Sequence, residues 1–148
     1  MIQIFVASLA ATALPTVPPT ATAKEAAYLL REPDVPALVV VDATETVVGM
    51  VTEADIVALV ATESTQLPVS GFMSNPVATV TPETSVHTAA DTMQEVGVKH
   101  LPVVKNGVYH GLLSVDDIAP YVSRHRLDIV WKGDSFRAPE GTTPQPAD

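Results

Sequence analysis

The stretch Thr79 to Val104, TVTPETSVHTAADTMQEVGVKHLPVV, has a second copy in the same chain. That copy lies 63 residues earlier, from Thr16 to Val41, and reads TVPPTATAKEAAYLLREPDVPALVVV. Ten of the 26 aligned pairs are identical, whereas a composition this rich in Ala, Val and Thr gives roughly two or three by chance. An offset of 62 then aligns Gly49, Asp55 and Ile56 with Gly111, Asp117 and Ile118. The chain therefore contains an internal repeat.

Each copy predicts the same order of elements: strand, helix, strand, strand, helix. In the second copy the helix is indicated by apolar residues at helical spacing, namely Val86, Ala89, Ala90 and Met93. The helix of the first copy begins with a capping pattern, Thr22 followed three residues later by Glu25. The apolar runs 37–41 and 101–104 are short and β-branched, which is typical of buried strands.

The connection between the last two strands differs between the copies. In the second copy Asn106-Gly107 predicts a two-residue type I′ hairpin, because both residues tolerate a positive φ. The first copy has the longer loop Asp42 to Thr46 at this place. In both copies we expect the next strand to lead directly into a helix, which begins at Thr52 or at Ser114.

Composition and charge exclude several classes of protein. The 148 residues are 47% hydrophobic, enough for a folded interior, and no unbroken apolar run is long enough to span a membrane. A net charge of −9 disfavours nucleic acids and anionic membranes as partners. The absence of Cys removes disulfides, thiolate nucleophiles and Cys-based zinc sites, and the His residues do not stand at metal-binding spacing. We therefore expect no metal site, no nucleic-acid partner and no membrane partner.

The apolar N-terminus has no Lys or Arg before Lys24, so we interpret it as part of the fold and the protein as cytoplasmic. We place the first repeat at residues 1–62, the second at 63–126 and a C-terminal tail at 127–148. The tail has no periodicity and is either mobile or docked on a neighbour. Because about 60 residues bury too little surface for an independent core, we expect the two repeats to form one pseudo-twofold unit.

The second copy resembles a CBS (cystathionine β-synthase) domain. The residues that carry the likeness are Met73-Ser74-Asn75-Pro76, Thr79-Val80, Pro82, Ala89-Ala90, Met93, Leu101-Pro102-Val103-Val104 and Gly111 to Ile118. The first copy is similar through Thr16-Val17-Pro18-Pro19, Ala26-Ala27 and Gly49 to Ile56, and it departs from the family pattern at Ala10 and Val39.

This resemblance implies an α/β fold of two pseudo-twofold-related CBS repeats packed as one module, the tandem pair called a Bateman module. Such modules are regulatory, and they commonly bind AMP, ADP, ATP or S-adenosylmethionine. They often dimerise into a flat disc and are not usually enzymes. The resemblance therefore implies an adenosine-containing regulatory ligand, no required cofactor and a homodimer.

A hydroxyl followed three residues later by a carboxylate stands at one helix start of each copy: Thr52 with Asp55, and Ser114 with Asp117. A helix N-terminus suits an anion, a hydroxyl can donate to a phosphate or ribose oxygen, and a carboxylate can accept both ribose hydroxyls. The same pattern is also a capping box that needs no ligand. Its recurrence in both copies, together with the resemblance, favours ligand binding.

Four further residues complete the predicted ligand-binding set. Thr16 and Thr79 open the first strand of each copy, where the family often places a threonine facing the nucleotide; the alternative is an ordinary strand residue. Lys99 and His100 precede the central strand of the second copy, and basic residues at this place in resembling sequences can reach ligand phosphates. The alternative for these two is a solvated pair.

The leading hypothesis is a stand-alone regulatory protein that binds an adenosine-containing ligand and signals through its conformation or its affinity for a separate effector protein. The alternative is a ligand-free dimerisation or interaction module. The chain has no P-loop, no plausible triad and no catalytic residues that we can assign, so we expect no enzyme activity. Because Pro36 and Ala37 stand in the first copy where the second has Lys99 and His100, we expect a phosphorylated ligand to depend on the second copy.

Overall fold

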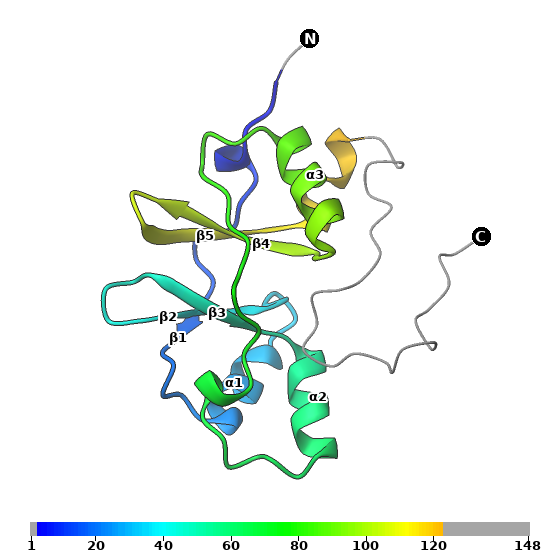
Figure 1. The fold of residues 1–148 in the computed structure, drawn as a ribbon. Helices are drawn as coiled ribbons and strands as arrows, with labels where there is room; N and C mark the ends of the chain where they lie inside the picture. The colour runs from blue at the N-terminus through cyan, green and yellow to red at the C-terminus, as the bar shows by residue number, and fades with distance from the viewer. Residues whose placement is uncertain (1–2, 123–148) are drawn as a thin grey trace, which may run out of the picture.

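Two small β-sheets face each other in the middle of the molecule, and the helices lie on their outer faces (Figure 1). The structure is a computed structural model and describes residues 3–122. It has the predicted α/β architecture of two related repeats. The predicted C-terminal tail, residues 127–148, lies outside the described residues.

The first repeat has the predicted order strand, helix, strand, strand, helix. Its elements are β1 (Thr16–Val17), α1 (Ala23–Leu30), β2 (Leu38–Val41), β3 (Val47–Val51) and α2 (Glu53–Ala61). In the sheet, β1 is parallel to β2 and β2 is antiparallel to β3. The two helices cover the sheet face that points away from the second repeat (Figure 1). Each begins at its predicted N-cap, Thr22 for α1 and Thr52 for α2.

The second repeat has the same arrangement, except that its first strand is reduced to a single bridge and its last helix is shorter. Its elements are α3 (Val86–Val96), β4 (His100–Lys105), β5 (Val108–Ser114) and α4 (Val115–Ile118), which continues into the 3-10 turn η3 (Ala119–Tyr121). The hairpin between β4 and β5 is confirmed, because Asn106 and Gly107 have φ of 53° and 80°. Both strand pairs carry a register shift at the same place, after Val40 in one and after Val103 in the other.

The predicted first strand of the second repeat is reduced to one parallel bridge. Val80 pairs with Val103, which is the counterpart of the Val17–Val40 pair between β1 and β2. Pro102 stands where the first repeat has Val39, and a proline has no N–H to donate to a second pair. The prediction that Thr79 opens a strand is therefore wrong: Thr79 only precedes this bridge.

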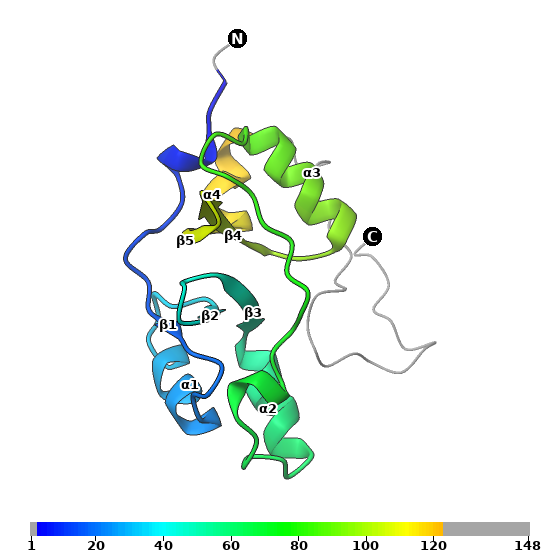
Figure 2. The same ribbon diagram turned by 60° about the vertical axis from the view of Figure 1, so that its left-hand side comes forward.

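Each repeat is completed by a short segment from another part of the chain. The segment before the first repeat packs on the second repeat, and the segment between the two repeats packs on the first. The 3-10 turn η1 (Val6–Ser8) lies on the second repeat, where the Val6 N–H donates to the Thr84 carbonyl at 2.8 Å. The turn η2 (Val69–Gly71) lies on the first repeat, where the Val69 N–H donates to the Ala21 carbonyl at 2.8 Å. Figure 2 shows the two connections, blue and green, on opposite sides of the molecule.

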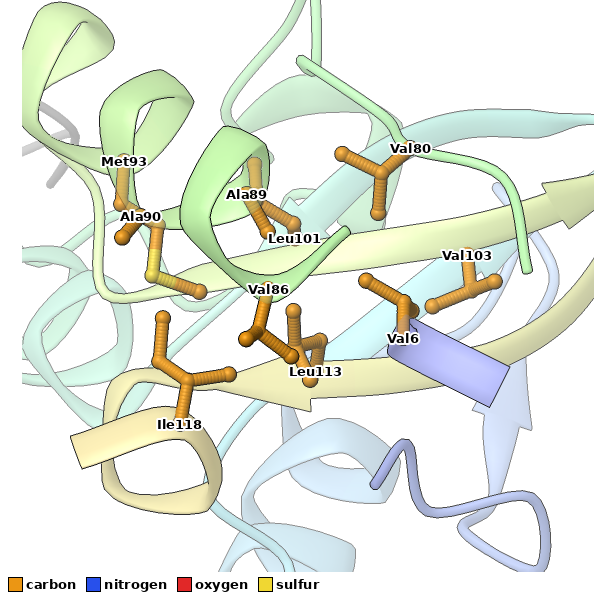
Figure 3. Packing of buried hydrophobic residues seen from close by; sticks show 10 residues of the cluster. All are labelled: Val6, Val80, Val86, Ala89, Ala90, Met93, Leu101, Val103, Leu113 and Ile118. Atoms are coloured by element: carbon orange, nitrogen blue, oxygen red, sulfur yellow. The ribbon is translucent and has the colours of Figure 1, made fainter. Parts of the chain in front are cut away.

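These segments enter the two hydrophobic cores. Val6 is fully buried in the second core, which Figure 3 shows with its ten residues, Val6, Val80, Val86, Ala89, Ala90, Met93, Leu101, Val103, Leu113 and Ile118. Val69 is fully buried in the first core in the same way. Because burying a Val side chain contributes about 1.5–3 kcal/mol, neither repeat has its whole core without the exchanged segment.

A third hydrophobic cluster lies between the two sheets. Its buried members are Ala37, Val39 and Met50 from the first repeat and Leu112 from the second. Backbone pairing reinforces this layer, since Ser74 bridges to Met50 and Ala11 bridges to Leu112. The two repeats therefore share an apolar interface and form one unit.

Candidate functional site

Both predicted hydroxyl–carboxylate pairs lie at helix N-termini and form capping boxes. The Asp55 Oδ2 accepts the Thr52 N–H at 2.8 Å at the start of α2. The Asp117 Oδ2 accepts the Ser114 N–H at 2.9 Å at the start of α4, and the Asp117 N–H donates to the Ser114 Oγ at 3.3 Å. The capping role that the sequence left open is therefore present in both repeats.

The two pairs differ in their accessibility. Asp55 is 3% exposed, whereas Asp117 is only partly buried. The hydroxyl residues Thr52 and Ser114 are both partly buried. A solvent-borne ligand therefore meets a more accessible carboxylate in the second repeat than in the first.

The basic pair of the second repeat lies beside its capping box. His100 is the first residue of β4 and pairs with Ser114, the last residue of β5. The carbonyl of Lys99 accepts the N–H of Val115 at 2.8 Å, so the chain before β4 is hydrogen-bonded to the first turn of α4. Four predicted site residues thus lie at or next to one end of the β4–β5 hairpin: Lys99, His100, Ser114 and Asp117.

The first repeat has no counterpart of this basic pair. Pro36 and Ala37 occupy the equivalent positions, and Ala37 is 1% exposed within the cluster between the sheets. Thr16 is the first residue of β1, is partly buried and pairs with Val39. Thr79 is exposed next to the Val80 bridge. The roles of Thr16 and Thr79 in ligand binding stay predictions.

Four apolar residues near the first strands and the capping boxes divide into two groups by their burial. Val51 and Leu113 are fully buried in the first and second cores, so a ligand has no access to them. Leu14 and Val77 are partly buried against the cluster between the sheets, and they are equivalent at the offset of 63. Leu14 and Val77 are therefore accessible to an apolar part of a ligand, whereas Val51 and Leu113 are not.

Sequence reasoning missed a contact between the repeats. The N–H of Tyr109 in β5 donates to the carbonyl of Glu45 in the loop between β2 and β3 at 2.9 Å. Burial raises the pKa of Tyr109. The sequence signal for the contact between Tyr109 and Glu45 was the extra length of the loop, which only the first copy has.

The loop that contains Glu45 also holds an acidic residue with a shifted pKa. Hydrogen bonds from Thr44 and Thr46 lower the pKa of Asp42.

Residues 3–122 lack both a membrane-spanning helix and a metal-binding cluster. None of their helices combines the length and the apolar character needed to cross a bilayer. No three His, Asp or Glu side chains in this part of the chain are grouped so that they could hold a metal ion.

Comparison with known proteins identifies the family. The CBS domain family matches residues 6–62 and again residues 69–124. An uncharacterized 17.7 kDa protein from Acidianus ambivalens is 38% identical over 125 residues, which cover 84% of this chain and 74% of that protein. An uncharacterized protein from Methanopyrus kandleri is 34% identical over 104 residues, and the match covers 68% of this chain but only 53% of that protein.

Solved structures show the same fold. A conserved CBS domain protein of unknown function from Thermoplasma acidophilum has a TM-score of 0.75 at 23% identity, covering 85% of this chain and 73% of its own. CBSX2, solved in complex with AMP, has a TM-score of 0.70 at 26% identity, covering 79% and 94%.

A third structure, the CBS domain pair of MJ0100, was solved in complex with 5′-methylthioadenosine and S-adenosyl-L-methionine. It has a TM-score of 0.71 at 22% identity, covering 80% of this chain and 95% of its own, and supports the fold alone. Since the two matched segments together span most of the sequence and the two repeats have the fold of CBS-pair structures, this chain belongs to the CBS domain family and carries a tandem CBS pair.

Proposed function

We propose that this chain is a regulatory CBS pair that binds an adenosine-containing ligand and passes the signal on by changing its conformation or its affinity for a separate protein. The ligand binds in the second repeat, where Ser114 and Asp117 contact the ribose and Lys99 and His100 contact phosphate. The chain acts as a homodimer. The observation that carries the proposal is the pairing of His100 with Ser114, which brings a basic pair next to a hydroxyl–carboxylate pair.

Charge favours the second repeat as the phosphate site. The chain has a net charge of −9, so a nucleotide phosphate needs a local source of positive charge. Lys99 and His100 supply it in the second repeat, whereas Pro36 and Ala37 supply none in the first. A charge-assisted hydrogen bond contributes about 1.5–3 kcal/mol, which corresponds to roughly tenfold or more in affinity. The first repeat accordingly binds a less charged adenosine compound or remains empty.

Two CBS-pair structures of the same fold contain adenosine compounds. CBSX2 was solved with AMP, and MJ0100 with S-adenosyl-L-methionine and 5′-methylthioadenosine. These ligands share adenosine and differ in charge. The ribose-binding carboxylate therefore serves any of them, and the basic pair distinguishes the phosphorylated ones from the others.

The test is calorimetric titration of the full chain with ATP, AMP and S-adenosylmethionine. We expect the Lys99→Ala, His100→Ala double variant to lose about tenfold or more in affinity for ATP and less for S-adenosylmethionine. The matched control is Lys105→Ala, which removes a positive charge at the other end of β4 and leaves ATP affinity nearly unchanged. If the double variant binds ATP as tightly as the wild type while Asp117→Ala does not, the phosphate assignment is wrong and the ribose assignment stands.

The second candidate function is a ligand-free interaction module. It is favoured by the capping boxes, in which Asp55 and Asp117 already satisfy backbone N–H groups without any ligand. Thermal melting separates the two functions, because a ligand that binds only the folded chain must raise the melting temperature. An unchanged melting temperature with every adenosine compound, together with no small molecule released from the denatured purified protein, contradicts the sensor and supports the module.

A further inference from the structure

The outer helical layer of the second repeat is shorter than that of the first. The last helix of the first repeat, α2, has nine residues, whereas α4 has four and is followed by the 3-10 turn η3. At the offset of 62, the last residue of α2, Ala61, corresponds to Ser123, the first residue after the described part of the chain. The chain beyond Val122 therefore begins, by this alignment, where the first repeat still has helix.

The surface that α3 and α4 form exposes apolar side chains. The two helices lie side by side on the outer side of the second sheet (Figures 1 and 2). Figure 3 shows Ile118 of α4 in the same core as Val86 and Met93 of α3. Val96, the last residue of α3, is 42% exposed, and Tyr121, the last residue of η3, is 44% exposed. We call the outer surface of α3, α4 and η3 the α3–α4 face.

The charges on the two helices of the α3–α4 face have one sign. Asp91 and Glu95 lie one turn apart on α3, Asp116 lies in the first turn of α4, and all three are exposed. Neither helix contains a Lys or an Arg. The equivalent helix of the first repeat, α1, has Lys24 in its first turn and Arg31 at its C-cap. A segment that covers the α3–α4 face is therefore favoured if it carries positive charge.

The stretch of chain that follows Val122 has the complementary composition. Residues 123–132 read SRHRLDIVWK and contain three of the eight Lys and Arg of the chain, with one Asp. Residues 3–122, by contrast, contain four Lys and Arg against 13 Asp and Glu. The same ten residues include the apolar run Ile129 to Trp131. This stretch is therefore both basic and apolar, which are the two properties that the α3–α4 face selects.

The attachment point puts this stretch within reach of the whole face. The helix α3 has 11 residues and is therefore about 16 Å long at 1.5 Å per residue. Ten residues of chain span up to about 33–36 Å. The stretch starts from Val122, which packs against the second core underneath the two helices. Because the connection is so short, the effective concentration of the stretch at the face of its own copy is high.

We propose that residues 123–132 dock on the α3–α4 face of the same copy, with their cations next to its carboxylates and their apolar side chains against Val96 and Tyr121. The docked stretch covers the helices of the second repeat, so another protein reaches this face only when the stretch is released. The proposal goes beyond the proposed function and holds for the ligand-free chain.

Fluorescence of Trp131 tests the docking, because the chain has a single Trp and its emission therefore reports on this stretch alone. In the ligand-free full chain we expect emission at a shorter wavelength than that of free Trp in water and weak quenching by acrylamide. Glu95→Lys should shift the emission to longer wavelength and strengthen the quenching, since it places a cation on the face. The matched control is Glu32→Lys, the same charge change at the equivalent exposed position of the first repeat.

A second variant tests the same contact from the side of the stretch. Arg124→Ala combined with Arg126→Ala leaves residues 3–122 unchanged, so their fold is not at risk if Glu95→Lys proves unstable. We expect the same shift of Trp131 emission to longer wavelength. Fully exposed Trp131 in the wild type overturns the proposal. Equal effects of Glu95→Lys and Glu32→Lys, or no effect of the Arg124, Arg126 double variant, also overturn it.

A nitroxide label locates the docked stretch, because it quenches Trp fluorescence only at short range. The chain has no Cys, so Val96→Cys carries one label on α3, and Val57→Cys, at a residue that is 68% exposed on α2, carries the control label. We expect the label at position 96 to quench Trp131 and the label at position 57 to leave it bright. Stronger quenching from position 57 places the stretch on the first repeat and contradicts the proposal.

Mixing two proteins shows whether the stretch docks on its own copy. The first protein is Val96→Cys with Trp131→Phe, which carries the label and has no Trp, and the second is the unlabelled wild type. We expect no quenching in the mixture, whereas the labelled Val96→Cys chain that keeps Trp131 is quenched. Quenching in the mixture shows that another copy supplies the stretch and overturns docking within one copy.

Discussion

The two repeats have the same sequence pattern and different chain connectivity. The first core is built from one continuous stretch, with its contributing residues between Leu14 and Met73. The second core is assembled from two stretches, with Ile4 to Ala10 from the N-terminus joining residues between Ala78 and Val122. Val69 and Val6 have the same role in the two cores, but only Val69 is close in sequence to the repeat that it completes. A sequence repeat is therefore not the same as a folding unit.

The largest expected effect is the loss of cooperative folding when the two repeats are separated into fragments. We expect residues 1–62 and residues 69–126 each to fail to melt cooperatively, because the first lacks Val69 and the second lacks Val6. A fragment of residues 12–76 keeps the first core whole and should show more helix and a steeper transition than 1–62. Circular dichroism during heating measures this. A sharp two-state melt of 1–62 at low concentration contradicts the exchange of segments.

Two equivalent glycines should respond differently to alanine. A Cβ at Gly111 would lie 2.7 Å from the backbone oxygen of Ala11, whereas a Cβ at Gly49 would meet the flexible side chain of Met73. Overpacking against backbone forces the N-terminal segment to move, so we expect Gly111→Ala to destabilise the chain by about 1–3 kcal/mol. Gly49→Ala should cost less. Urea denaturation of both variants checks the order, and a larger loss for Gly49→Ala contradicts it.

The two capping carboxylates offer a matched pair of substitutions. Asp55→Ala removes the acceptor of the Thr52 N–H at a site where the carboxylate is 3% exposed, so water replaces it poorly. We expect a loss of about 1–2 kcal/mol. Asp117→Ala should cost less, because Asp117 is only partly buried, so water can take the place of its carboxylate more easily. Thermal melts of both variants measure the difference in stability. Equal losses of stability would show that the burial of the carboxylate does not set the cost of removing it.

The loop between β2 and β3 should give a small dependence on pH that the short hairpin of the second repeat lacks. Hydrogen bonds from Thr44 and Thr46 lower the pKa of Asp42 below its ordinary value of 3.8. Because the folded pKa lies below the unfolded one, the charged carboxylate stabilises the fold at neutral pH, and this contribution is lost as the pH falls through the folded pKa. We expect Asp42→Asn to melt slightly lower than the wild type at neutral pH and the gap to close in acid. A gap that widens in acid contradicts this sign.

The sequence by itself determined the elements whose causes are local. The helix starts at Thr22, Thr52 and Ser114 were predictable because a cap depends on residues three positions apart. The hairpin at Asn106-Gly107 was predictable because its turn needs positive φ at two adjacent residues. The order of elements followed from the internal repeat and from helical and strand periodicity, and the resemblance to the CBS family placed the two repeats in one module.

Tertiary structure alone decided how the repeats complete each other and which parts of the candidate site are accessible. The burial of Val6 in the second core depends on partners more than 70 residues away, and no local pattern specifies such a contact. The loss of the strand at Thr79 depends on Pro102 in the neighbouring strand. The same holds for the different exposure of Asp55 and Asp117, whose sequence motifs are nearly the same. Side-chain burial is set by the elements that pack around a residue, and long-range packing is the part of folding that spacing along the chain does not specify.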